Sequence, residues 1–323
     1  MKRFFAGFGF IAAVGLLAAQ QDPPEKKAPQ KAKTAVAPAI RFNATPAAVV
    51  GSAGDTQAVA ASKDGRRVAS SGGSLNPATG FISVIDTESR KELLGLKTPR
   101  PFNSAGLSPD GKILAVTGTA GELKVIEVDS GKTLFTKQLG AAAQLAFAPD
   151  GKSIATVTQG KTLQIWDVPG GAERLKYTSV PAPLRCVAFS GDGKKLFAGG
   201  GETKQGTANG TILVYDIAKK TLDKKLETNS PAQVFSIAAN RDGSVVVGVS
   251  NDFQVRVWDV ANAKVTTELT PQQQVTGVAF APDGKSVAAS MGTGVIRLWN
   301  PANGEELGVL ERHIGACRCV ACD

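Results

Sequence analysis

The chain has 323 residues, of which 42% are hydrophobic and 20% are charged, and its formal net charge is +9. Residues 1–48 hold seven of the 37 Lys and Arg residues and two of the 28 Asp and Glu residues, so 30 basic residues face 26 acidic ones in the remainder. That near balance, without aromatic residues interleaved among the lysines, argues against a nucleic-acid partner. The single histidine argues against a two-histidine metal site or a histidine-activated nucleophile.

The N-terminal region resembles a targeting segment followed by a linker. Residues 1–19 begin with Met-Lys-Arg and continue as an apolar stretch that ends in small residues, which predicts a secretory signal peptide. The stretch is shorter than the roughly 20 residues of a membrane span, so we expect no span after its removal. A retained N-terminal anchor is the alternative. Residues 20–44, rich in Pro, Lys and Ala, are expected to form a disordered tether. We therefore predict an exported protein, periplasmic or extracellular.

Asp-Gly pairs recur along the rest of the chain at intervals of 40 to 50 residues. In each pair, the Asp side chain favours a turn and the Gly supplies the positive φ that closes a hairpin. A regular period of this length is typical of repeat architectures. The six pairs are Asp64-Gly65, Asp110-Gly111, Asp150-Gly151, Asp192-Gly193, Asp242-Gly243 and Asp283-Gly284.

The unit from residue 275 to residue 310 shows what each repeat contains. Apolar or β-branched runs at 275–281, 286–290, 295–299 and 305–310 are separated by turns that contain Gly, Pro or Asn. No unit offers ten residues of helical periodicity free of Gly or Pro. Four antiparallel strands in each repeat predict an all-β fold, a β-propeller of four-stranded antiparallel blades.

The ends of the third strands carry a family resemblance. Ile165-Trp166-Asp167 and Val257-Trp258-Asp259 resemble WD40 repeats, and residues 82–87 resemble the related YVTN class of bacterial propeller repeats. The resemblance spans about residues 45–322 and implies a propeller over residues 45–323. WD40 blades usually carry a Gly-His pair and a turn Asp, whereas this chain offers only His313 and Asp252. We therefore expect apolar packing between blades, rather than a His–Asp network, to stabilise the ring.

The C-terminus leaves the number of blades open. Residues 317–322 align with residues 184–189, the first strand of the fourth repeat, so a seventh repeat begins and stops at Asp323. This pattern favours a seven-bladed ring with an incomplete last blade, and a six-bladed ring with a spare strand is the alternative. An incomplete blade would leave strand edges open for pairing with a partner. Cys322 aligns with Phe189 and Phe280 and is predicted to be buried, with disulfides formed by Cys317, Cys319 and Cys322 as the alternative.

Two repeats carry extra residues between their second and third strands. The excess lies at 70–80 and at 199–210, and both segments are predicted to be loops that project from the same face. A plain connection between two strands does not need this length. The two segments are therefore the candidate binding elements, with an idle surface insertion as the alternative. The candidate binding residues are Ser74, Asn76, Glu202, Lys204, Gln205 and Asn209.

The sequence offers little material for catalysis. Each Asp-Gly turn supplies one carboxylate, whereas Ca²⁺ takes six to eight oxygen ligands, and no phosphate-binding glycine loop occurs. We predict no catalytic residue, no metal and no cofactor. The predicted function is a non-enzymatic scaffold of the cell envelope that binds an unidentified protein or peptide. The YVTN-like segment implies the alternative, a lactonase-like hydrolase with its site at the central channel.

Overall fold

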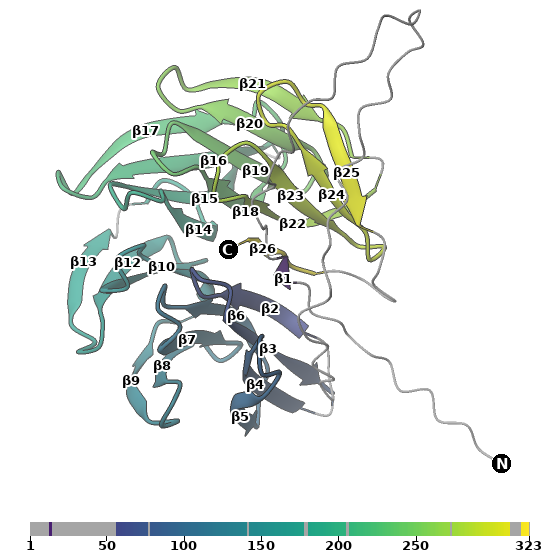
Figure 1. The fold of residues 1–323 in the computed structure, drawn as a ribbon. Coiled ribbons are helices and arrows are strands. Elements are labelled where there is room, and N and C mark those ends of the chain that lie inside the picture. The colour runs from purple at the N-terminus through teal and green to yellow at the C-terminus, as the bar shows by residue number, and fades with distance from the viewer. Residues whose placement is uncertain are drawn as a thin grey trace, which may run out of the picture.

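The computed structural model describes residues 13–14, 56–76, 78–140, 142–177, 180–204, 207–271, 273–310 and 318–322. Their strands form six four-stranded antiparallel sheets, which are arranged as blades around a common centre (Figure 1). In every sheet the four strands pair in sequence order, and the first strands of successive blades contact one another near the centre. The predicted all-β propeller is confirmed.

The first three blades occupy the chain up to residue 177. Blade 1 contains β2 (Thr56–Ala61), β3 (Arg67–Leu75), β4 (Ala78–Asp86) and β5 (Glu92–Thr98). Blade 2 contains β6 (Phe102–Leu107), β7 (Ile113–Gly118), β8 (Glu122–Glu127) and β9 (Thr133–Gln138). Blade 3 contains β10 (Ala142–Phe147), β11 (Ser153–Thr158), β12 (Thr162–Asp167) and β13 (Glu173–Tyr177).

The other three blades follow in the same order. Blade 4 contains β14 (Leu184–Phe189), β15 (Lys195–Lys204), β16 (Thr207–Asp216) and β17 (Thr221–Glu227). Blade 5 contains β18 (Val234–Ala239), β19 (Val245–Ser250), β20 (Val255–Asp259) and β21 (Lys264–Leu269). Blade 6 contains β22 (Val275–Phe280), β23 (Val287–Met291), β24 (Ile296–Trp299) and β25 (Glu306–Leu310).

The Asp-Gly turns join the first and second strands of each blade, as predicted. In all six turns an Asp Oδ1 accepts a hydrogen bond from the backbone N–H two residues later, at 2.9 to 3.1 Å. The turn glycines have φ between +65° and +72°, a conformation that glycine adopts without steric cost. In the first turn, hydrogen bonds from the Ser62 hydroxyl and the Arg66 amide hold the pKa of Asp64 below its ordinary value. The repeated aspartates are therefore turn caps.

Apolar clusters between neighbouring blades hold the ring together. Between blades 3 and 4, for example, Val157 and Leu163 pack with Leu196 and Leu213, and all four are fully buried. Comparable clusters join blades 1 and 2, blades 2 and 3, blades 4 and 5, and blades 5 and 6. The second strands β7, β11 and β19 are buried on both faces, which explains their Val, Leu, Ile and Ala content. This agrees with the expected role of apolar packing.

Residues 318–322 lie between the last blade and the first. Val320 packs against the core of blade 6, whereas Cys319 and Ala321 pack against Val59 and Val68 of blade 1. The strand β26 (Ala321–Cys322) pairs in parallel with β1 (Ala13–Val14). The six-bladed alternative is the one that the structure confirms, because the described residues form no seventh four-stranded sheet. Val320, Cys319 and Ala321 instead supply side chains that fill the space between two complete blades.

The segments at 70–80 and 199–210 are strands, not the loops that the sequence predicted. The pairing of β3 with β4 continues to Leu75 and Ala78, and that of β15 with β16 continues to Lys204 and Thr207. These hairpins have nine and ten residue pairs, against six in blade 3. The prediction of loops was wrong for a physical reason. Gly, Ser and Thr are typical of loops, but here the glycines allow other backbone to approach closely, and the segments pair as strands.

One such close approach occurs at Gly210, where the connection from blade 4 to blade 5 crosses the hairpin. A Cβ on Gly210 would lie 2.1 Å from the backbone oxygen of Ala232 and 2.7 Å from Oγ1 of Thr228. We predict that Gly210→Ala lowers the free energy of unfolding by about 2 kcal/mol, because a methyl group there forces the connection away. Urea denaturation measures the effect. Gly170→Ala is the matched control, since a Cβ there meets nothing within 4 Å, and equal stability of the two variants would contradict the prediction.

Candidate functional site

The blades divide the surface of the ring into two faces. Antiparallel strands alternate in direction, so the turns between second and third strands open on one face, together with the connections between blades. We call this the hairpin face, because the long hairpins β3–β4 and β15–β16 end there. The Asp-Gly turns and the turns between third and fourth strands lie on the opposite face, which we call the Asp-Gly face. The predicted binding residues that the structure describes, Ser74, Asn76, Glu202, Lys204 and Asn209, belong to the two long hairpins.

The hairpin of blade 1 ends in an apolar residue between two predicted binding residues. Leu75 is 74% exposed, which makes it the most exposed of the large hydrophobic residues that the structure describes. Beside it, the backbone N–H of Asn76 donates to the Ser74 hydroxyl at 3.2 Å, so the tip has a defined shape. An exposed leucine on a paired hairpin offers a partner apolar area at little cost in conformational entropy.

The hairpin of blade 4 carries the other predicted residues. Glu202 lies opposite Asn209 in the register, and Lys204 lies opposite Thr207 near the tip. The Asn209 side chain is exposed, and Gln205 lies outside the described residues. The structure thus gathers Glu202, Lys204 and Asn209 on one hairpin. It does not bring them to Ser74 and Asn76, because blades 2 and 3 stand between the two hairpins (Figure 1).

Gln233 joins the base of this hairpin to blade 5. Its Nε2 donates to the backbone oxygen of Gly201 at 3.2 Å, and its Oε1 accepts from Nε of the exposed Arg185 at 2.7 Å. Its backbone oxygen accepts from the N–H of Asn251 at 3.0 Å. The side chain and the backbone oxygen of Gln233 therefore connect an inner strand, the long hairpin and the turn at 250–254.

Phe253 on that turn was missed by the sequence analysis. It is 44% exposed and has a φ of +63°, a conformation that costs a non-glycine residue about 1–2 kcal/mol. The same turn position is taken by Gly121 in blade 2 and Gly294 in blade 6, both at positive φ. An aromatic residue at a position of glycine in aligned repeats is the signal that could have identified it. Phe253 adds an apolar contact point to the hairpin face.

We predict that Phe253→Gly raises the free energy of unfolding by up to about 1 kcal/mol, because glycine removes the strain of the left-handed backbone. The same variant should weaken binding of a partner at the hairpin face, since it removes an exposed ring. Lys161→Gly is the matched control, because Lys161 occupies the same turn position in blade 3 with a φ of +62°. Thermal unfolding and a binding assay separate the two effects. A less stable Phe253→Gly protein would show that the ring contributes packing instead.

A buried ion-pair network fixes this turn. The carboxylate of Asp252 accepts hydrogen bonds from Arg256 Nη2 at 2.8 Å and from the Ser230 hydroxyl at 2.7 Å. Arg256 is 6% exposed, and its Nε also donates to Glu268 at 3.2 Å. Burial alone would raise the pKa of Asp252, but the hydrogen bonds from Arg256 and Ser230 outweigh it and hold the pKa below its ordinary value. Serine and arginine here take the role that a histidine would have.

The described residues offer no assembled catalytic or metal site. Among them, no three His, Cys, Asp or Glu side chains are grouped so that they could hold a metal ion. Cys186 is fully buried and burial raises the pKa of its thiol, so it is a core residue and not a nucleophile. His313 lies outside the described residues. Across the described part of the chain, no helix has the length and apolar character that a membrane crossing requires.

Comparisons with known proteins agree with this architecture. The sequence model for "WD domain, G-beta repeat" matches residues 138–167, 221–259 and 263–300. These segments include strands of blades 3 to 6, among them the two Trp-Asp strand ends and the third strand of blade 6.

Curated relatives include subunits of named complexes. The chain is 29% identical over 213 residues to Periodic tryptophan protein 2 of Arabidopsis thaliana, covering 65% of this chain and 23% of the relative. It is 21% identical to the Target of rapamycin complex subunit wat1 of Schizosaccharomyces pombe, covering 61% and 64%. It is 23% identical to the COMPASS component SWD3 of Saccharomyces cerevisiae, covering 69% of each chain. The match thus spans about a quarter of the first relative and about two thirds of the second.

These relatives correct the predicted location. They are eukaryotic intracellular proteins, which contradicts a periplasmic or extracellular location. The prediction rested on residues 1–19, and of these the structure describes only Ala13 and Val14, as strand β1. A basic start followed by a short apolar run is a compositional signal, and an apolar segment that pairs as a strand has the same composition.

Proposed function

Because the chain belongs to the WD40 family of β-propeller repeat proteins, we propose that its hairpin face binds a protein partner through the two long hairpins and the turn at Phe253. WD40 relatives are scaffolds and complex subunits rather than enzymes, and this chain is a non-enzymatic interaction scaffold of the same kind. The alternative of a lactonase-like hydrolase rested on the resemblance of residues 82–87 to YVTN repeats, and the WD40 relatives do not support it. The named complexes of the relatives belong to those proteins and identify no partner here.

The observation that carries the proposal is the continued pairing of the two hairpins beyond the length of the other blades. Three and four additional residue pairs, at about 3.3 Å per residue, extend the hairpins by roughly 10–13 Å. Among the residues whose side chains the structure describes, the members of the clusters between blades lie nearer the base of each hairpin. Paired strands hold their side chains in fixed positions, so a partner can bind them without ordering a loop.

A partner strand at the last blade, the other contact that the sequence suggested, has a competitor in the chain itself. β1 already pairs with β26, and the residues around β26 pack against blades 1 and 6. The hairpins have no such competitor among the described residues. We therefore place the partner on the hairpin face rather than at the strand edge.

Site-specific photo-crosslinking tests the proposal. A photoreactive amino acid is introduced at Ser74 or at Asn209, and in control proteins at Lys112 or Lys285, which are exposed on the Asp-Gly face. In extracts of the source cells, we expect the two hairpin positions to crosslink to the same protein and the two control positions not to do so. Crosslinks to that protein from the control positions alone would place the partner on the wrong face and refute the proposal.

A further inference from the structure

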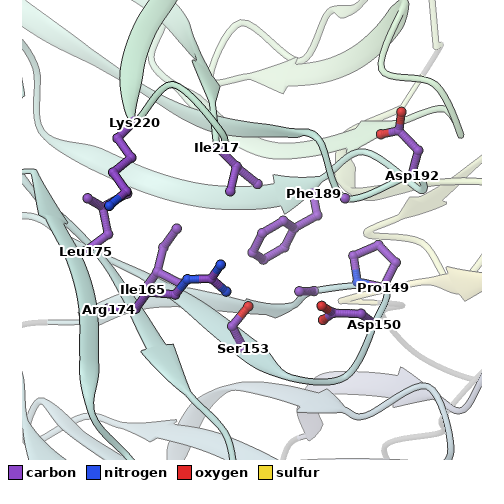
Figure 2. A pocket seen from close by; sticks show the side chains of 12 residues that line it. Pro149, Asp150, Ser153, Ile165, Arg174, Leu175, Phe189, Asp192, Ile217 and Lys220 are labelled. Atoms are coloured by element: carbon purple, nitrogen blue, oxygen red, sulfur yellow. The ribbon is translucent and has the colours of Figure 1, made fainter.

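The Asp-Gly face contains a cavity between blades 3 and 4 that the proposed function does not use. Its volume is about 180 Å³, which suits a single side chain better than a drug-sized ligand, for which pockets of roughly 300–1,000 Å³ are usual. Its floor is apolar and its rim is charged (Figure 2). The floor consists of Pro149, Ile165, Leu175, Phe189 and Ile217, and the rim carries Asp150, Arg174, Asp192 and Lys220.

The side chain at one repeat position differs between the blades and accounts for the open space beside blade 3. The first residue of the second strand is Arg67 in blade 1 and Lys195 in blade 4, and each side chain fills the space beside the next blade. Arg67 Nη1 donates to the backbone oxygen of Gly111 at 3.2 Å, and Lys195 Nζ donates to that of Gly243 at 3.0 Å. Blade 3 has Ser153 at this position, whose side chain is too short to reach blade 4. The missing side chain leaves the space open.

The rim carries two carboxylates and two cations, which differ in the partners that they already have. Oδ1 of Asp150 accepts the Lys152 N–H at 2.9 Å, and Oδ1 of Asp192 accepts the Ser190 hydroxyl at 2.7 Å, so both carboxylates already cap their turns. Arg174 and Lys220, in contrast, have no carboxylate partner among the described residues. Figure 2 shows the Arg174 guanidinium directed into the cavity, towards Ser153 and Phe189. Arg174 and Lys220 are therefore the exposed cations at the rim without a carboxylate partner among the described residues, and Arg174 is the one that Figure 2 shows beside Ser153.

We infer that this cavity is a second binding site, which takes the glutamate side chain of an acidic peptide segment from a protein partner. The carboxylate binds to Arg174, whose planar guanidinium matches its two oxygens, and Ser153 and Lys220 lie close enough to the cavity to contribute. An apolar residue next to the glutamate packs on Phe189 and Leu175. The site goes beyond the proposed function, because it lies on the other face and none of the hairpin residues lines it.

Fluorescence anisotropy with defined peptides tests the inference on the full chain. The probe is a labelled, end-capped Gly-Leu-Glu-Leu-Gly peptide, and its Glu→Gln analogue is the comparison. We expect the analogue to bind about tenfold more weakly, the difference of one charge-assisted contact. Arg174→Gln should weaken the glutamate peptide by about the same factor, whereas Lys176→Gln on the same strand should leave it within about twofold.

Two further measurements keep the result unambiguous. Ser153→Lys should abolish binding, because the lysine fills the cavity as Lys195 fills the space between blades 4 and 5. Ser286→Lys, at the same position of blade 6, should leave binding unchanged. Circular dichroism confirms that each variant is folded. Equal affinity of the glutamate and glutamine peptides, or no effect of Arg174→Gln, would overturn the inference. Tighter binding of a phosphoserine peptide than of the glutamate peptide would also overturn it, because the site would then be a phosphate site.

Discussion

Asp252→Ala is expected to lower the free energy of unfolding by about 3 kcal/mol, because it leaves the buried guanidinium of Arg256 without its main partner. The Arg256 side chain is 8% exposed and its Nη1 already lacks a hydrogen-bond partner. Glu268 remains as a second partner, but it is 59% exposed and contacts only Nε. The Ser230 hydroxyl also loses its acceptor. Urea denaturation at neutral pH measures the change.

A double variant provides the control for this prediction. Arg256→Met removes the buried charge while keeping much of the side-chain volume, so Asp252→Ala combined with Arg256→Met should be more stable than Asp252→Ala alone. The difference in stability between these two variants then measures the effect of the unpaired Arg256 charge. The stability that the double variant still lacks relative to the wild-type protein reflects the lost hydrogen bond from the Gln254 N–H to Asp252. If the double variant proves less stable than Asp252→Ala, the loss has come from packing and the account of the network is wrong.

The same network predicts how the effect depends on pH. The pKa of Asp252 is lowered in the folded protein, so its contribution to stability is fully present above the unfolded value of about 3.9. The contribution disappears as the pH falls through the lower pKa of the folded state. The stability difference between the wild-type protein and Asp252→Ala should therefore shrink as the pH is taken from 7 to well below 4. A difference that is constant over this range would mean that the charge of Asp252 is not involved.

Trp258→Ala should be at least as damaging, with an expected loss of about 3–5 kcal/mol. Trp258 is fully buried between blades 4 and 5, where it packs with Phe197, Ile212 and Cys186. Its Nε1 donates to the backbone oxygen of Glu227, although at 3.4 Å this bond is long. The substitution opens a cavity the size of an indole in a cluster that joins two blades.

Trp258→Phe separates packing from other roles of the indole. It keeps an aromatic ring in the cluster, so it should lose less than half as much stability as the alanine variant. Both are measured by thermal and urea unfolding. An alanine variant with wild-type stability but impaired partner binding would identify Trp258 as a ligand contact and would contradict its place in the core.

The sequence predicted the blades well because their signals are local. An Asp-Gly turn involves only a few neighbouring residues. Its Asp side chain accepts a hydrogen bond from the backbone N–H two residues later, within the same turn. Trp166, Trp258 and Trp299 recur at one position of the repeat, and all three are buried. The choice between six and seven blades could not be made in this way. It depends on whether residues 318–322 pair as a new blade or fill a space between old ones, which is a matter of long-range packing.

The candidate site was predicted only in part. Counting residues between strands identified the two longer segments, but composition suggested loops where Gly80 and Gly210 permit close backbone contact and the strands continue. Phe253 was missed because its positive φ is not visible without comparing turns. The cavity at Ser153 was missed for a related reason, since the effect of a short side chain depends on what Arg67 and Lys195 do in other blades.

Trimming the two hairpins tests the central claim, that the hairpin face holds the partner. Residues 73–80 and 201–210 are each replaced by Gln-Gly-Lys, the turn that ends the shorter hairpin of blade 3 at residues 159–161. The affinity of the trimmed protein for the crosslinked partner is then measured by calorimetry, with circular dichroism to confirm the fold. We predict a dissociation constant at least about tenfold higher than that of the intact protein. An unchanged dissociation constant in a folded, trimmed protein would contradict the claim.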